Sequence, residues 1–186
     1  RLSVTPESRA LVSIFFATQE IKKDTGVPEE IAPGEVRKLG VLGAGLMGSG
    51  IACVAAEAGA SVRLKDESLP ALGRGLSQAR SVYDERRKRR SLTALEVGQR
   101  MDRISPSLDL RGFGRADLVI EAVFEDLELK RRVLAEVEGV IPETAVFGSN
   151  TSSIPIGEIA QGSRRPERVL GMHFFSPVHK MPLLEV

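Results

Sequence analysis

Apolar residues along this chain fall into short runs separated by longer stretches of helical spacing. The short runs have the length and composition of strands covered on both faces, and they lie at residues 38–42, 61–64, 116–123, 145–147 and 168–172. A weaker strand candidate lies at residues 104–110. Helical stretches lie between the runs, ending near residue 58 or spanning 70–90, 94–101, 125–140 and 156–160. This alternation predicts an α/β fold of Rossmann type, doubly wound around a mainly parallel sheet.

An additional helix is predicted ahead of the first strand. Thr5 followed by Pro6 is typical of a helix start, and Gly26 is expected to end the segment. Apolar residues recur along it at helical spacing, namely Leu11, Ile14, Phe15 and Ile21. We therefore expect residues 1–36 to form a linker helix and linker, and residues 37–186 to form the main domain.

The first strand runs into a glycine-rich turn. Gly43, Gly45 and Gly48 have the G-x-G-x-x-G spacing, which combines a tight turn, room for a pyrophosphate and close packing of the next helix. Asp66 follows the second strand, 23 residues after Gly43, where a ribose hydroxyl needs an acceptor. A carboxylate there would repel a 2′-phosphate, which favours NAD over NADP, although Arg63 and Lys65 are nearby cations. The alternative is an ordinary glycine-rich turn followed by a surface aspartate.

The composition and net charge do not indicate binding to nucleic acid or to a membrane. The 186 residues carry a formal charge of +1, and no apolar run approaches the length of a membrane span. Residues 86–90 are five consecutive cations, which we interpret as the solvated face of a polar helical arm rather than a nucleic-acid site. The single cysteine, Cys53, is expected to be a small core thiol in a reducing compartment. We assign no residue to a metal site.

Polar side chains gather where two of the later strands end. Asn150, Thr151, Ser152 and Ser153 offer hydroxyls and an amide to a substrate oxygen, although Ser153 could instead cap the next helix. His173 follows the last strand, and Glu185 interrupts an apolar run 12 residues later. A chain that turns back near residues 176–181 would bring Glu185, as a buried partner, beside the imidazole. Such a pair makes a general base suited to neutral pH, although a lone histidine is more often structural.

Four ordered motifs together resemble the L-3-hydroxyacyl-CoA dehydrogenases. They are GAGLMG at 43–48, DLVIEAVFE at 117–125, SNTSS at 149–153 and GMHFFSPV at 171–178. The resemblance runs from about residue 38 to residue 186. The preceding helix and the KMPLLE segment at 180–185 are most similar to the alpha subunit of the multifunctional fatty acid oxidation complex.

The resemblance implies a role for each matching residue. His173 would be the catalytic base, Glu185 its orienting carboxylate, and Ser152 the donor to the reacting C3 oxygen, with Asn150 beside the substrate. The glycines would be joined in the NAD site by Met47, Asp66, Val123, Phe124, Glu125, Lys130, Ser152 and Ser176. The family often has asparagine at the position of Ser176, so one cofactor contact is weaker here.

The implied activity is the NAD-dependent oxidation of (S)-3-hydroxyacyl-CoA to 3-ketoacyl-CoA in fatty acid β-oxidation. Implied partners are an enoyl-CoA hydratase module and a C-terminal dehydrogenase domain of the same chain, with a thiolase subunit as a further candidate. Both ends look cut, since the chain starts at Arg1 and stops at Val186 within an apolar run. We expect a bacterial cytoplasmic protein, or a mitochondrial or peroxisomal one in a eukaryote.

Two other readings remain open. As an isolated piece, the chain could be a dinucleotide-binding module without catalysis. A dehydrogenase of nucleotide sugars or small hydroxyacids would share the glycine turn, but it would not explain the segment from His173 to Glu185.

Overall fold

The structure, a computed structural model, describes residues 5–21, 23, 27–28, 30–32 and 34–186. The chain divides into two units, Arg1–Glu35 and Val36–Val186. In the first unit, α1 (Pro6–Ile21) begins as predicted, because the Thr5 hydroxyl accepts a hydrogen bond from the Ser8 N–H at 3.2 Å. The apolar side chains of α1 are exposed. Gly26, its predicted end, lies outside the described residues.

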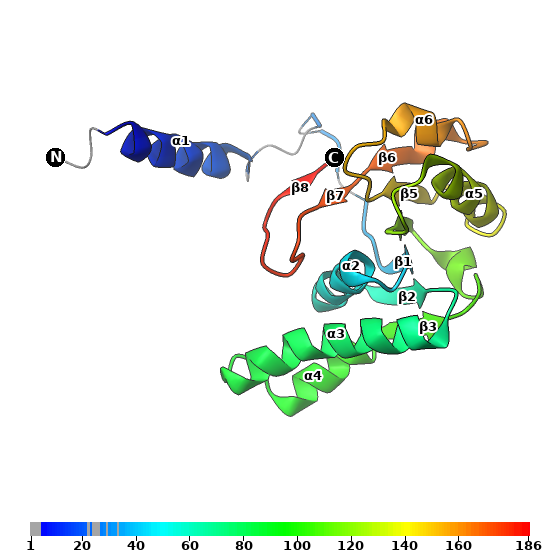
Figure 1. Cartoon of the computed structure of the whole chain (residues 1–186), viewed down its shortest axis with the longest axis horizontal. Helices are drawn as coiled ribbons and strands as arrows, with labels where there is room; N and C mark the ends of the chain where they lie inside the picture. The colour runs from blue at the N-terminus through cyan, green and yellow to red at the C-terminus, as the bar shows by residue number, and fades with distance from the viewer. Residues whose placement is uncertain (1–4, 22, 24–26, 29, 33) are drawn as a thin grey trace. The chain divides into compact units, whose positions relative to one another are not determined.

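The second unit is built on a six-stranded parallel sheet (Figure 1). Its strands are β1 (Lys38–Leu42), β2 (Ser61–Lys65), β3 (Ile104–Ser107), β4 (Leu118–Glu121), β5 (Val146–Ser149) and β6 (Val169–Gly171). Their order is β3-β2-β1-β4-β5-β6, so the direction of winding reverses between β1 and β4. This arrangement confirms the predicted Rossmann-type fold, and it places the ligand side at the carboxyl ends of these strands.

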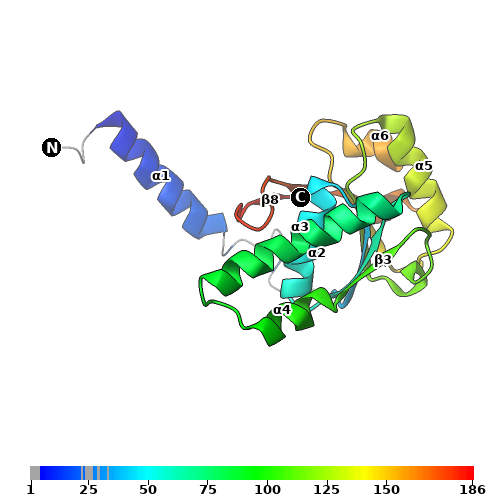
Figure 2. The same ribbon diagram turned by 60° about the horizontal axis from the view of Figure 1, so that its bottom comes forward.

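Helices cover both faces of the sheet. One face carries α2 (Leu46–Glu57), α3 (Leu69–Lys88) and α4 (Ala94–Met101), which lie together in Figure 2. The other carries α5 (Leu127–Glu138) and α6 (Ile156–Ala160), while short 3₁₀ turns η2 (Phe113–Arg115) and η3 (Pro166–Arg168) lead into β4 and β6. Adjacent strand residues Val119 and Ile120 belong to opposite hydrophobic clusters, as expected for a sheet buried on both faces.

Strand β4 is shorter at both ends than the apolar run that predicted it. At its start, the Asp117 carboxylate accepts hydrogen bonds from the N–H groups of Arg37 and Lys38 at 2.9 and 2.8 Å. Beyond its end, Asp126 caps α5 by accepting from the Leu129 N–H at 2.7 Å. The helix therefore begins after Glu125, and the prediction that Glu125 lies in its first turn is wrong.

The chain leaves the main sheet before His173. Strand β6 ends at Gly171, and β7 (His173–Phe174) pairs antiparallel with β8 (Leu184–Glu185) in a separate two-stranded sheet. The expectation of one strand running on to His173 is therefore wrong. After this point the Phe174 N–H donates to the Asn150 side-chain oxygen at 2.9 Å, and Phe174 pairs with Leu184 rather than with β5.

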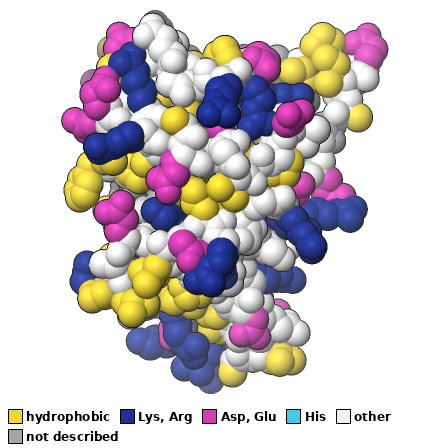
Figure 3. Space-filling model, turned by 90° about the vertical axis from the view of Figure 1, so that its right-hand side faces the viewer, with side chains coloured by type: hydrophobic (Ala, Val, Ile, Leu, Met, Phe, Trp, Pro, Cys, Tyr) yellow, Lys and Arg dark blue, Asp and Glu magenta, His cyan; other side chains and the backbone are white. Residues whose placement is uncertain are grey.

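Charged side chains are mixed in sign on the face shown in Figure 3. On the arm, Asp84 pairs with Arg80 and Arg87, and Arg86 pairs with Glu57, as expected for a solvated helix face. No helix in the described part of the chain has the length and hydrophobicity to cross a bilayer. Within those same residues, we find no group of three potential metal-binding side chains.

Candidate active site

The glycine turn has the geometry of a phosphate cradle. Gly43 has a φ of +94°, and a Cβ added at Gly48 would lie 1.8 Å from the Gly43 carbonyl oxygen, so both positions exclude a side chain. At Gly45 nothing lies within 4 Å of the position a Cβ would take. The first N–H groups of an α-helix such as α2 have no partner within the helix, and a helix N-terminus favours an anion. The turn thus fits the pyrophosphate of a dinucleotide.

Asp66 is oriented by the same turn. One of its oxygens accepts from the Ala44 N–H at 2.8 Å, and the other accepts from the Glu67 N–H at 2.7 Å. The guanidinium of Arg63 donates to the Arg111 carbonyl at 2.9 Å and to the Ser107 hydroxyl at 3.1 Å. These bonds hold Arg63 against the loop after β3, so the guanidinium of Arg63 is already engaged there. The contact of Asp66 with a ribose stays a prediction.

The predicted imidazole–carboxylate pair is present. His173 Nδ1 lies 2.7 Å from Glu185 Oε2, because the two residues are directly opposite in the β7–β8 register. The side chain of Glu185 is 60% exposed and that of His173 is 27% exposed. The prediction of a buried carboxylate is therefore wrong, since strand pairing brings Glu185 to the imidazole at the surface. Nδ1 is occupied by the carboxylate, which leaves Nε2 for a substrate.

Glu125 organises the polar loop that follows β5. Its Oε1 accepts hydrogen bonds from the Thr151 hydroxyl at 2.6 Å and from the N–H groups of Ser152 and Ser153 at 3.0 and 3.2 Å. Burial acts to raise the pKa of Glu125, but these hydrogen bonds and the nearby Lys130 ammonium outweigh it and lower the pKa to about 2. The carboxylate is thus ionised at neutral pH and fixes the loop.

This loop does not cap the helix that follows it. Helix α6 starts after Pro155 without a side-chain cap, so the alternative of Ser153 as its cap is wrong. Ser152 is exposed, and its hydroxyl makes no hydrogen bond with any described residue, which leaves it available to a substrate oxygen. Asn150 has already used its side-chain oxygen on the Phe174 N–H. Its amide NH₂ group can still donate to a substrate oxygen, and the contact of Asn150 with substrate stays a prediction.

Two ionic residues at the base of the site are fully buried. The Lys130 ammonium lies 2.7 Å from Glu121 Oε1 and 3.3 Å from Glu125 Oε2, and the side chains of Lys130 and Glu121 have no exposed surface. Lys130 therefore lies below the turn formed by residues 123–125, and its burial speaks against the direct cofactor contact predicted for it. Sequence reasoning did not assign a role to Glu121. The signal was an acid within an apolar run, nine residues before a lysine.

The other predicted cofactor residues lie at the carboxyl end of the sheet or in the loop after β7. Val123 and Phe124 follow β4, and Phe124 is 86% exposed. Met47 is half-buried in the first turn of α2, and Ser176 is exposed in the loop between β7 and β8. Their contacts with NAD stay predictions.

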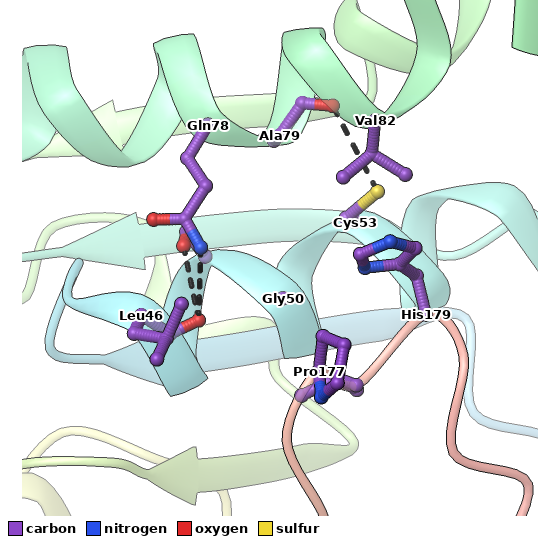
Figure 4. Close-up of a pocket in the computed structure, with 10 residues that line it drawn as sticks. Leu46, Gly50, Cys53, Gln78, Ala79, Val82, Pro177 and His179 are labelled. Carbon is purple, nitrogen blue, oxygen red and sulfur yellow. Dashed lines mark hydrogen bonds between the residues drawn. The ribbon is translucent and has the colours of Figure 1, made fainter. Parts of the chain in front are cut away.

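The loop between β7 and β8 is anchored on α2. A Cβ added at Gly50 would lie 2.9 Å from a Val178 methyl carbon, so glycine permits this close packing. The loop, α2 and α3 border a small cavity of about 20 Å³, and Cys53 and His179 are among the residues that line it (Figure 4). Burial raises the pKa of the Cys53 thiol, which lies 3.9 Å from the Ala79 carbonyl oxygen. Cys53 is thus a core thiol, as predicted.

The sequence and structure were compared with known proteins, and the matches indicate the family of this chain. Residues 38–186 match the family described as 3-hydroxyacyl-CoA dehydrogenase, NAD binding domain. The structure is similar to 3-hydroxybutyryl-CoA dehydrogenase from Escherichia coli K12, with a TM-score of 0.78 and 40% identity over 81% of this chain and 32% of that one. It is also similar to (S)-3-hydroxybutyryl-CoA dehydrogenase from Ralstonia eutropha, with a TM-score of 0.78 and 37% identity over 81% of this chain and 53% of that one.

A third similar structure is the dehydrogenase part of multifunctional enzyme 1 from Caenorhabditis elegans, with a TM-score of 0.70 and 27% identity. It is covered over 34% of its length, against 81% of this chain. The chain therefore spans between a third and about half of these relatives. Since the family match extends over most of its residues, the chain belongs to the 3-hydroxyacyl-CoA dehydrogenase family and carries the NAD-binding domain of that family.

Proposed function

We propose that the protein oxidises (S)-3-hydroxyacyl-CoA to 3-ketoacyl-CoA with NAD as cofactor. The observation that carries the proposal is the 2.7 Å contact between His173 Nδ1 and Glu185 Oε2. The His173–Glu185 pair follows β6, the Gly43–Gly48 turn follows β1, and the Ser152 loop follows β5. Because these strands are parallel, their carboxyl ends place all three features at the same edge of the sheet.

Each group then has a chemical task. The Gly43–Gly48 turn and Asp66 would hold NAD, and the bound cofactor would supply the acceptor for the hydride from C3. His173 Nε2 removes the proton from the 3-hydroxyl group, and Glu185 stabilises the imidazolium that forms. The Ser152 hydroxyl donates a hydrogen bond to the C3 oxygen, which holds the alcohol in position. Asp66 accepts from the adenosine ribose, which favours NAD over NADP.

The pathway, the partner modules and the location of the protein are proposed from similarity alone. The similarity to the dehydrogenase part of a multifunctional enzyme supports a role in fatty acid β-oxidation, beside an enoyl-CoA hydratase module and a C-terminal dehydrogenase domain. The exposed apolar side chains of α1 are suited to packing against such a module. A thiolase subunit and a bacterial cytoplasmic location belong to the same proposal.

The test is turnover by two histidine variants of the full-length protein. His173→Gln removes the proposed base, and it should lower kcat for acetoacetyl-CoA reduction by about 10²-fold or more while NADH affinity changes little. His179 lies in the loop between β7 and β8 and is exposed, so His179→Gln is the matched control and should keep wild-type kcat. Unchanged turnover in His173→Gln would refute the proposal.

A second candidate function is a dinucleotide-binding module without catalysis. It is favoured by one observation, that the chain covers 32% to 53% of the dehydrogenases it resembles. Calorimetry with NADH and an acetoacetyl-CoA assay on the 186-residue chain separate the two. Binding without turnover by this chain, together with turnover by the full-length protein, would assign the module role to the chain alone.

A further inference from the structure

Glu121, at the end of β4, accepts more hydrogen bonds than its position in a hydrophobic strand requires. Its Oε1 accepts from the Lys130 ammonium at 2.7 Å and from the Ser149 hydroxyl, and its Oε2 accepts from the Val123 N–H at 3.1 Å. The side chain has no exposed surface, so it cannot touch a ligand directly. Whatever it does for a ligand must pass through the groups that it holds.

Those groups lead to both halves of the site. Residues 123–125 form the turn on the predicted cofactor side of the site, and the Val123 N–H lies at the start of this turn. Through Lys130, Glu121 is linked to Glu125, because the same ammonium lies 3.3 Å from Glu125 Oε2. Glu125 in turn accepts from the Ser152 N–H on the substrate side. One ammonium between two carboxylates therefore connects the turn after β4 with the loop after β5.

Stability alone does not account for this arrangement. A buried ion pair pays a large desolvation cost, and well-packed hydrophobic side chains often stabilise a fold as well. Hydrocarbon in place of Glu121 would leave the Val123 N–H and the Ser149 hydroxyl without their acceptor, and it would leave Lys130 attached to Glu125 alone. The pair thus fixes directions that packing cannot fix.

We propose that Glu121 is a positioning residue for the dehydrogenase site, setting the turn 123–125 and, through Lys130 and Glu125, the Ser152 loop. The proposal rests on the proposed function for its catalytic consequence. The structural part of the proposal does not rest on the proposed function, because it follows from the hydrogen bonds alone.

The test compares two buried glutamates attached to the same helix. Glu121→Gln keeps the size of the side chain and removes its charge. Glu138→Gln is the matched control, since Glu138 is the last residue of α5, its side chain is 5% exposed, and it accepts from the Ser163 hydroxyl and from the Arg164 N–H at 2.8 Å. Both variants lose a buried acceptor, but only Glu121 is linked to the site.

Amide hydrogen exchange without cofactor gives the first readout. In Glu121→Gln, the Ser152 N–H should exchange at least about tenfold faster, because Lys130 loses the carboxylate that fixes its position and so holds the acceptor Glu125 less firmly. NADH affinity should fall about tenfold, and kcat should fall about 10- to 100-fold, as expected for a small misplacement of reacting groups. Glu138→Gln should leave all three unchanged.

Equal behaviour of the two variants would overturn the proposal. That result is a lower melting temperature in both, with exchange at Ser152, NADH affinity and kcat unaltered. If Glu121→Gln does not fold, Ser149→Ala takes its place, since it removes one donor from Glu121. Faster exchange at Ser152 is still expected, and unchanged exchange overturns the proposal. A wild-type protein without dehydrogenase turnover would refute the proposed function, while exchange and NADH affinity would still test the positioning role.

Discussion

Gly45 and Gly48 belong to one motif, yet the structure separates what each of them does. A Cβ at Gly48 would lie 1.8 Å from the Gly43 carbonyl oxygen, whereas a Cβ at Gly45 would meet nothing within 4 Å. Gly45 has φ −72° and ψ −168°, a conformation open to alanine. We therefore predict that Gly48→Ala damages the fold, and that Gly45→Ala leaves the fold intact but obstructs the cofactor.

The magnitudes follow from these distances. At Gly48 the start of α2 must move by more than 1 Å to relieve the contact, and overpacking of this kind costs about 1–3 kcal/mol. For a domain of this size that lowers the melting temperature by about 2–12 °C. For Gly45→Ala the free energy of unfolding should change by less than about 0.5 kcal/mol. Loss of one hydrogen bond to a phosphate, worth about 1.5–3 kcal/mol, weakens NADH binding about 10- to 100-fold.

Thermal melts and NADH calorimetry on the same samples provide the assay. Gly73→Ala is the control, because Gly73 is exposed within α3 with nothing within 4 Å of its Cβ position, and alanine there should stabilise the helix by about 0.5–1 kcal/mol. Wild-type NADH affinity in Gly45→Ala, or a wild-type melting temperature in Gly48→Ala, would refute the reasoning.

Three further changes test the supports of the site. The pKa of Glu125 falls from 4.5 in the unfolded chain to about 2 in the folded protein, so its contribution to stability is complete above pH 4.5 and is lost as the pH falls toward 2. In urea titrations at a series of pH values, Glu125→Gln should therefore weaken the dependence of the unfolding free energy on pH between 4.5 and 2. Tyr83→Phe should lower the free energy of unfolding by about 1–2 kcal/mol, since the buried Cys53 carbonyl loses a 2.6 Å hydrogen bond, and unchanged stability would contradict this. Asp126→Ala should cost about 1 kcal/mol by removing the cap of α5, measured by chemical denaturation.

Elements set by local signals could be predicted closely from the sequence. The helix expected at residues 94–101 is α4, and its Thr93–Glu96 capping box lies within four residues. The β1–α2 turn was equally accessible, because the positive φ of Gly43 and the close approach of Gly48 to the Gly43 carbonyl oxygen both arise within the turn. Even the pairing of His173 with Glu185 depends on one short hairpin, whose turn residues lie between them.

Features that depend on contacts distant in sequence could not be predicted in the same way. Glu125 has an acidic neighbour and a helix after it, so local rules place it in the first helical turn. In the structure it reaches residues 26 to 28 positions later, in the loop after β5. The burial of Lys130 also depends on tertiary contacts, because its ammonium meets Glu121 rather than solvent only when α5 packs against the sheet.

The pairing of Glu185 with His173 was predicted correctly, but the burial predicted for Glu185 was wrong. An acid in an apolar run suggested burial, but strand residues alternate between two sides, so an acid between Leu184 and Val186 can face outward while Leu184 faces inward. His173 and Glu185 share a side because they are directly opposite in the hairpin. A slip of one residue would place Leu184 or Val186 opposite the imidazole and remove its carboxylate. The register is therefore what the site depends on, and the packing of Val178 against Gly50 anchors the loop that sets it.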